Sequence, residues 1–179
     1  MEVKRITLPM SKETAKSLRA GDRALLSGTL YTARDAAHGR LMNLIEKGEK
    51  LPFDITGQVI YYAGPSPAKP GEVIGSIGPT TSGRMDAFTP TLLDKGLAGC
   101  VGKGKRSKEV RESLKKNGAV YFAATGGAAA LLAQRVKSCE VVAYEDLGCE
   151  AIRRLEVEDL PVTVINDSEG NDLYEEVSK

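Results

Sequence analysis

Residues 78–86 read GPTTSGRMD and combine two glycines, a proline, three hydroxyl side chains, an arginine and an aspartate. Glycine and proline interrupt regular structure, and serine and threonine compete for backbone hydrogen bonds. The stretch is therefore predicted to be a tight turn. Backbone N–H groups after such a turn attract anions, and Arg84 adds a planar fork that suits a carboxylate. A simple cap needs one hydroxyl, so three of them beside an arginine favour a carboxylate or phosphate site.

The segments around this turn alternate between strand and helix patterns. Apolar or alternating runs predict strands at residues 3–8, 23–31, 59–63, 73–77, 99–101, 119–123, 140–144, 152–157 and 162–165. Helices are predicted at residues 11–18, 33–47 with Thr32 as the cap, 89–95, 108–116 and 128–136. This alternation predicts an α/β fold in a single domain over residues 1–179, with a mixed sheet because both ends are rich in strands.

Composition narrows the class of protein. The chain has 179 residues, of which 41% are hydrophobic and 27% charged, with a net charge of +1. These values are typical of a globular protein and give no reason to expect a polyanionic partner. The three cysteines show no CxxC spacing, which argues against a disulfide framework or a metal site made from them alone. No apolar run is long enough for a signal peptide or membrane span, so we expect a soluble, cytoplasmic protein in a reducing environment.

Two more polar segments follow predicted strands. In RDAAH, residues 34–38, Arg34 and His38 lie four positions apart and would share one helix face. In GKGKRS, residues 102–107, Lys103 stands between two glycines on exposed backbone. This segment lacks the glycine spacing of a Walker A loop, and no aromatic residues interleave with its charges, so nucleic-acid binding is disfavoured. Solvated surface is the alternative for each segment taken alone.

Together these segments predict one site. Ligand groups in open α/β sheets gather at strand ends. Arg34, Thr80, Arg84 and Lys103 would then form a cationic pocket with hydroxyl groups, suited to a small dicarboxylate. The pocket offers no paired Cys/His set and no strong electrophile. An enzyme built this way would need its Lewis acid from outside the chain.

At this level of detail the sequence resembles the β subunit of the iron–sulfur hydro-lyases, the class I fumarases and L-tartrate dehydratases. GPTTSGRMD, TARDAAH and GKGKRS carry the resemblance. It continues through PFDITGQVIYYAGPSPAKPG, AATGGAAALLAQ and EDLGCEAIRRLEVEDLPVTVINDSEGND, which together cover nearly the whole chain. The resemblance implies a swivelling β/β/α domain. Two positions depart from the family pattern, which often has Ala at Ser82 and Asn at Lys105.

The resemblance also implies roles for individual residues. Thr80 matches a proposed catalytic base, and Arg84 matches an arginine that binds a substrate carboxylate. Arg34 and Lys103 match a second arginine and a lysine of the pocket. We therefore predict Thr80, Lys103 and Arg84 as catalytic residues. The predicted substrate-binding residues are Arg34, Arg84, Thr81, Lys103 and His38, with His38 in a supporting role.

The implied reaction is the reversible hydration of fumarate to (S)-malate. A 4Fe–4S cluster would be bound by a partner α subunit and not by this chain, in an assembly expected to be α2β2. The alternatives are an L-tartrate dehydratase β subunit and a non-enzymatic module that binds small carboxylates. A phosphocarrier domain that uses His38 is disfavoured, because this histidine comes one turn after the start of its helix.

Overall fold

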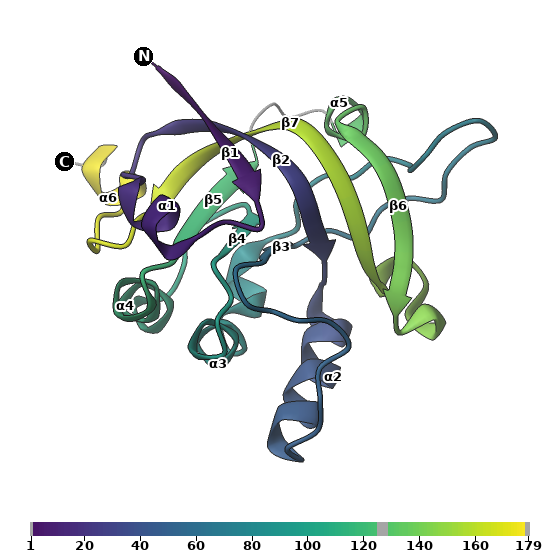
Figure 1. Cartoon of the computed structure of the whole chain (residues 1–179), viewed down its shortest axis with the longest axis horizontal. Coiled ribbons are helices and arrows are strands. Elements are labelled where there is room, and N and C mark those ends of the chain that lie inside the picture. The colour runs from purple at the N-terminus through teal and green to yellow at the C-terminus, as the bar shows by residue number, and fades with distance from the viewer. Residues whose placement is uncertain (1, 125–128, 178–179) are drawn as a thin grey trace.

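The computed structural model describes residues 2–124 and 129–177 of the chain. The strands are β1 (Val3–Leu8), β2 (Arg23–Thr32), β3 (Val59–Tyr61), β4 (Gly99–Gly102), β5 (Val120–Ala124), β6 (Val136–Ala143) and β7 (Ile152–Asn166). The helices are α1 (Lys12–Ser17), α2 (Asp35–Glu46), α3 (Thr89–Asp94), α4 (Lys108–Asn117), α5 (Ala129–Ala133) and α6 (Leu173–Val177), with 3-10 turns η1 (Ser82–Met85) and η2 (Glu145–Glu150). Figure 1 shows the strands curving over a layer formed by α2, α3 and α4.

The strands form one mixed sheet of seven, in the order β1-β2-β3-β4-β5-β7-β6. Strands β1 to β5 run parallel to their neighbours, whereas β7 is antiparallel to β2, β5 and β6. Because β7 pairs with both β5 and β2, strands β2, β3, β4, β5 and β7 close into a barrel-like ring. The predicted α/β fold with a mixed sheet is confirmed.

Alternation along the strands separates two hydrophobic cores. On β3, Val59 and Tyr61 pack into one core while Ile60 packs into the other, as period-two side-chain geometry requires. The first core lies between the curved strands and also receives α1 and α5. The second lies between the sheet and the layer of α2, α3 and α4, where Leu41 and Leu114 are fully buried. The helix layer is thereby fixed against the parallel half of the sheet.

Local signals account for the helix that follows β4. Ser107 caps α4, since its hydroxyl accepts a hydrogen bond from the Val110 amide at 3.3 Å. The helix ends at Gly118, whose φ of 65° is a left-handed conformation that glycine adopts readily. Lys115 and Lys116 in its last turn complement the helix dipole.

Some predicted boundaries were wrong. Thr32 does not cap a helix. It is the last residue of β2, and its hydroxyl accepts from the Arg153 amide, while Arg34 takes the N-cap position. The helix predicted at residues 128–136 is only α5, because Val136 already begins β6, which is longer than predicted; residue 128 lies outside the described residues. The two strands predicted in 152–165 are the single strand β7.

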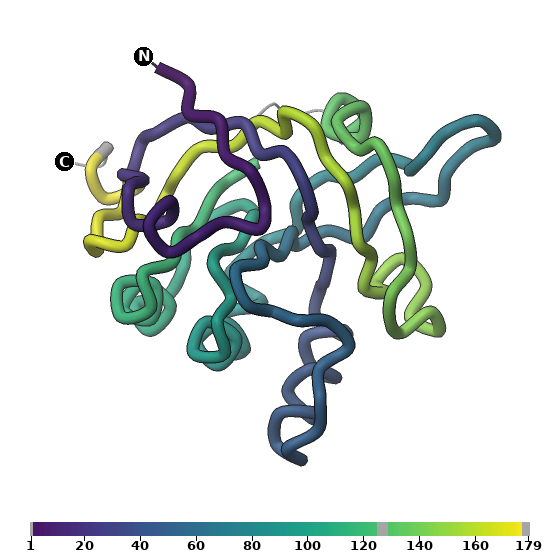
Figure 2. The backbone as a smooth tube through the Cα atoms, in the orientation of Figure 1, coloured from purple at the N-terminus to yellow at the C-terminus, as the bar shows by residue number. Residues whose placement is uncertain are grey.

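The strand predicted at residues 73–77 is absent from the described structure. Residues 64–77 instead form an excursion that projects from the body in Figure 2. The Ser66 amide donates to the Ser76 carbonyl at 3.0 Å, so the two arms run side by side. Pro65 and Pro67 have no N–H groups, and a regular ladder therefore does not form. In the part of the chain described, no helix has the length and apolar character to cross a membrane.

Candidate functional site

The carboxyl ends of three neighbouring parallel strands build the candidate site. Arg34 lies two residues beyond β2, and Lys103 directly follows β4. Residues 78–86 pass over the end of β3, between these two, where the Thr80 amide donates to the Tyr62 carbonyl at 2.7 Å. The strand order β2-β3-β4 therefore brings segments from three parts of the sequence to one edge, as expected for an α/β sheet.

Thr81 and Lys103 lie side by side in an isolated parallel bridge. The Ser82 amide donates to the Lys103 carbonyl at 2.9 Å and extends this pairing into η1. Neighbours in a bridge project to the same face, so the exposed Thr81 and Lys103 side chains share one surface. The amides of Thr80 and Ser82 both donate to backbone carbonyls, so these two N–H groups are not free to bind an anion.

Arg84 reaches from η1 to the first turn of α2. Its Nε donates to Asp35 Oδ2 at 3.0 Å, and the Arg84 side chain is 52% exposed. This ion pair directs the guanidinium toward the segment that carries Arg34, the residue before Asp35. The Nε of Arg84 is thus bonded to Asp35, which orients the guanidinium, and the two terminal nitrogens remain available to a ligand.

Arg34 crosses the backbone at Gly64. A Cβ atom at position 64 would lie 3.1 Å from Arg34 Cδ and 2.9 Å from the Cys149 carbonyl oxygen, so only glycine fits here without displacing neighbours. The Arg34 Nε is buried and has no hydrogen-bond partner among the described residues. An unpaired buried guanidinium N–H is costly, and an anionic ligand would satisfy it.

His38 lies beneath Arg34 and is fully buried. Its Nδ1 is 2.8 Å from the Arg34 carbonyl, which accepts a hydrogen bond from the Nδ1–H tautomer. Burial lowers the pKa of His38 to about 4, and the ring packs against Tyr62 and Phe88. A neutral, inaccessible imidazole supports the Arg34 backbone and has no access to a phosphoryl donor.

Two of the three predicted catalytic residues have side chains without a polar partner among the described residues. Within the described residues the Thr80 hydroxyl makes no hydrogen bond, and the Lys103 ammonium makes no ion pair. The structure thus brings Arg34, Thr80, Thr81, Arg84 and Lys103 to one open edge, with His38 behind them. None of these six lines the cavity of about 300 Å³ between the 64–77 excursion and residues of β6, η2 and β7. The site is an open surface.

Sequence reasoning missed two residues that organise this edge, Arg106 and Asp35. Arg106 had been counted only as part of a basic loop, yet its side chain is fully buried and paired with Asp86 at 2.7 Å. Asp35 was quoted within its motif without a role, although it orients Arg84. The local pattern of GKGKRS does not distinguish a buried Arg106 from a solvated one, so no sequence signal identified its role.

The described residues do not fit an iron–sulfur cluster. No group of three or more His, Cys, Asp or Glu side chains that could hold a metal ion occurs in residues 2–124 and 129–177. Cys100 is buried, Cys139 is half-buried and Cys149 is exposed. Burial raises the pKa of Cys100 and Cys139, which disfavours the thiolate form that a cluster requires.

Comparison with known proteins identifies a family that covers nearly the whole chain. The family model "Fumarase C-terminus" matches residues 1–177. The chain is 43% identical to the putative L(+)-tartrate dehydratase subunit beta of Methanocaldococcus jannaschii, and the match covers 95% of this chain and 90% of that protein. It is also 43% identical to the anaerobic class I fumarate hydratase of Escherichia coli strain K12, with 87% of this chain covered.

The two kinds of relative differ in length. The chain spans 29% of the Escherichia coli fumarate hydratase and 33% of a putative class I fumarate hydratase from Geobacillus stearothermophilus, to which it is 35% identical. The archaeal protein, by contrast, is matched over nearly all of its length. The same unit therefore occurs both within a longer chain and as a chain of its own size.

Proposed function

The chain belongs to the fumarase C-terminus family, and from this premise we propose that it forms the substrate-binding half of an iron–sulfur hydro-lyase. The proposed reaction is the reversible hydration of fumarate to (S)-malate. The observation that carries the proposal is the convergence of three cationic side chains and an unpaired hydroxyl at one sheet edge. A compact anion with two carboxylates matches that set.

The cations act on the charge that develops during the reaction. Removal of the C3 proton of malate spreads negative charge over the neighbouring carboxylate. Arg34, Arg84 and Lys103 would stabilise this charge, and fixed donors of this kind are worth roughly 2.7–4 kcal/mol each in other enzymes. Support comes from the Arg34 guanidinium, whose buried Nε has no hydrogen-bond acceptor among the described residues.

Thr80 is the proposed base for the C3 proton. A threonine hydroxyl is very weakly acidic, so it becomes useful only beside positive charge in a desolvated site. Its neighbour Thr81 pairs with Lys103, which keeps that ammonium near the Thr80 segment. Thr81 is proposed to contact the substrate, and His38 to support Arg34.

Departure of the hydroxyl group needs an electrophile that the described residues do not supply. We assign this electrophile to a 4Fe–4S cluster on a partner α subunit, in an α2β2 assembly. The open character of the site is consistent with a partner that covers it. The archaeal relative is named as a subunit beta, which supports such a partnership.

Tartrate is the alternative substrate. It is favoured by the archaeal relative, whose size matches this chain and whose name is that of a tartrate dehydratase subunit. Fumarate is preferred because several relatives of 41–43% identity, from bacteria and from Leishmania major, are named fumarate hydratases. The two substrates share a pair of carboxylates and differ in their hydroxyl groups, so the same cations serve both.

Anaerobic purification with the partner chain tests the proposal. The tagged chain should retain a brown, cluster-bearing protein, and the complex should hydrate fumarate faster than it dehydrates L-tartrate. Neither chain alone should turn over either substrate. Full activity of the isolated chain would contradict the proposal. Binding of malate by the isolated chain with no partner retained would instead support a non-enzymatic carboxylate module.

A further inference from the structure

Arg106 is a buried cation that forms an ion pair with Asp86, the last residue of the 78–86 segment. Its side chain has no solvent exposure. Burial by itself lowers the pKa of Arg106, but Tyr62, Cys100 and Asp86 outweigh this effect and hold its pKa above the ordinary value. The guanidinium is therefore permanently charged inside the protein, an arrangement that is costly unless its partners are well placed.

Arg106 bonds to segments on both sides of the site. Its Nε donates to Asp86 Oδ1 at 2.7 Å, and its Nη2 donates to Thr89 Oγ1 at 2.7 Å and to the Tyr62 hydroxyl at 3.1 Å. Asp86 also accepts from the Ser107 amide at 2.9 Å through its other oxygen. Asp86, at the end of the 78–86 segment, is thereby joined to residues 106–107 by two charge-assisted hydrogen bonds.

Two tyrosine rings enclose the guanidinium. Arg106 Cζ lies 5.1 Å from the ring centre of Tyr62 and 4.7 Å from that of Tyr121. These distances are within the range of cation–π attraction. The Tyr121 hydroxyl donates to the Gly104 carbonyl at 2.9 Å and is 2.7 Å from Ser82 Oγ, so it links the same two segments a second time.

We propose that Arg106 is a positioning residue, which locks residues 78–86 to residues 102–107 and so fixes Thr80 and Arg84 relative to Lys103. This inference rests on the proposed function for its catalytic consequence. That Arg106 holds the two segments together is inferred from the contacts alone and does not depend on the proposed function. Every contact of the Thr81–Lys103 bridge lies within the two segments that Arg106 and Tyr121 hold together. A displacement of about 1 Å can cost about 100-fold in rate.

The test uses Arg106→Met, which keeps much of the apolar stem and removes the guanidinium. Hydrogen exchange of the full chain should show at least roughly tenfold faster exchange at the Ser82 and Ser107 amides, whose acceptors are Lys103 and Asp86. Amides between β2 and β7 should be unchanged. Equal exchange in wild type and variant would overturn the proposal, whatever the enzyme's substrate.

The assembled enzyme provides the second measurement. We expect kcat to fall about 10- to 100-fold, with a smaller change in KM, because the substrate carboxylates still meet the same cations. Leu160→Ala in β7 is the control for stability, since Leu160 is buried in the barrel core. At a temperature well below both melting points, Leu160→Ala should keep kcat. An equal loss in the two variants would overturn the positioning role.

Two further variants keep the proposal testable if Arg106→Met does not fold. Asp86→Asn retains the shape of the side chain and weakens the bond to Arg106, and Tyr121→Phe removes only the hydroxyl between Ser82 and Gly104. Each should accelerate the same amides and lower kcat. Arg106→Lys should restore much of the melting temperature but not kcat, because an ammonium cannot reproduce the planar fork. Full recovery of kcat by lysine would contradict the inference.

Discussion

Asp35 and Arg84 join two motifs that lie about fifty positions apart in the sequence, with Nε of the arginine donating to Oδ2 of the aspartate at 3.0 Å. Asp35 belongs to the first turn of α2 and Arg84 to η1. The pair is about half exposed on the arginine side, so its effect on the free energy of unfolding is small, of the order of 0.2–1 kcal/mol. Its consequence is orientation of the Arg84 guanidinium.

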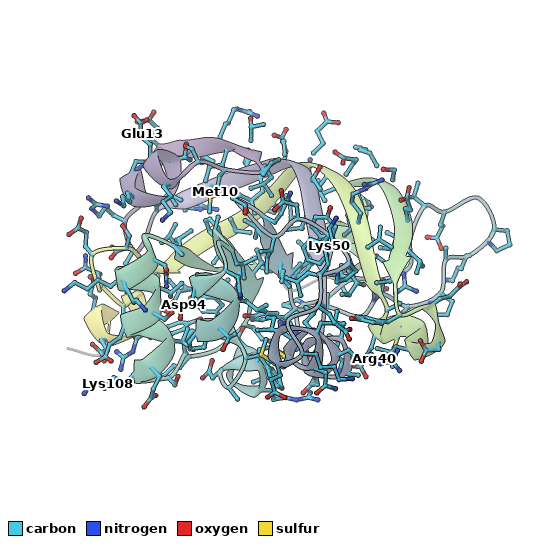
Figure 3. All side chains as sticks on the ribbon, turned by 60° about the horizontal axis from the view of Figure 1, so that its bottom comes forward. Met10, Glu13, Arg40, Lys50, Asp94 and Lys108 are labelled. Carbon is cyan, nitrogen blue, oxygen red and sulfur yellow. The ribbon has the colours of Figure 1, made fainter. Side chains whose placement is uncertain are left out.

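Arg84→Lys tests that orientation. We expect kcat/KM of the assembled enzyme to fall about 10- to 100-fold, because a lysine ammonium cannot bond Asp35 and a substrate carboxylate with one planar fork. The melting temperature should hardly change. Arg40→Lys is the matched control, since Arg40 on α2, labelled in Figure 3, also forms an ion pair, with Asp146, and is not one of the predicted site residues. If both substitutions left kcat/KM unchanged, the role of Arg84 would be refuted.

Thr80→Ala tests the proposed base. General-base catalysis typically contributes at least about 100-fold, so kcat should fall by that amount or more. Thr80→Ser should retain most of the activity, because it keeps the hydroxyl group. Thr81→Ala is the comparison in the adjacent position and should raise KM more than it lowers kcat. Steady-state kinetics of the three variants distinguishes the roles, and unchanged turnover of Thr80→Ala would exclude Thr80 as the base.

The burial of His38 predicts how stability depends on pH. Its pKa is about 4 in the folded protein, with desolvation as the largest cause, against 6.5 for the ordinary group. Between these values the unfolded chain binds a proton that the folded chain does not. The free energy of unfolding therefore falls as the pH drops from 6.5 toward 4, by about 3 kcal/mol at the lower limit.

Urea unfolding at pH 7 and pH 4.5 measures this contribution. His38→Asn keeps a donor for the Arg34 carbonyl and removes the titrating ring, so its loss of stability over this interval should be smaller than that of the wild type by about 2 kcal/mol. Carboxylates titrate in both proteins and cancel in the comparison. Identical pH profiles would show that His38 is protonated in the folded state.

Much of the candidate site could be anticipated because the relevant signals are local. Arg34 and Lys103 each follow an apolar run, and parallel strands place their carboxyl ends at the same edge. That these residues lie together follows from the strand order. The roles of Thr80, Arg84 and the others stay predictions until activity is measured.

Features that depend on distant partners were not predictable from one sequence. An arginine in GKGKRS has the same local pattern whether it is solvated or buried, and only the fold brings Asp86 and two tyrosine rings around Arg106. Likewise, β7 is a single strand because β2 pairs with it on both sides of a register shift, which includes Asp159 with its positive φ, and also at Pro161. Tertiary pairing overrides local signals in both cases.

A substitution at Gly102 tests how tightly residues 102–107 pack against residues 78–86. A Cβ atom at this position would collide with Ser82 Oγ and would lie 2.9 Å from Tyr62 Cδ2. We expect Gly102→Ala to lower the free energy of unfolding by about 1–3 kcal/mol, as overpacking does, and to lower kcat by displacing the Ser82 segment. Gly39→Ala is the matched control. Nothing lies within 4 Å of a Cβ at that helical position, so this change should stabilise the protein by about 0.4–1 kcal/mol.

A double substitution separates the two causes of strain at Gly102. Ser82→Ala alone should cost about 1 kcal/mol, because it removes the buried hydrogen bond to Tyr121. In Gly102→Ala/Ser82→Ala the hydroxyl collision is gone while the Tyr62 contact remains, so the combined loss should be at least about 0.5 kcal/mol smaller than the sum of the single losses. Chemical denaturation of the four proteins measures this coupling. Strict additivity would mean that Ser82 moves away from the new Cβ atom at little cost. The 78–86 segment would then be less firmly held than its hydrogen bonds imply.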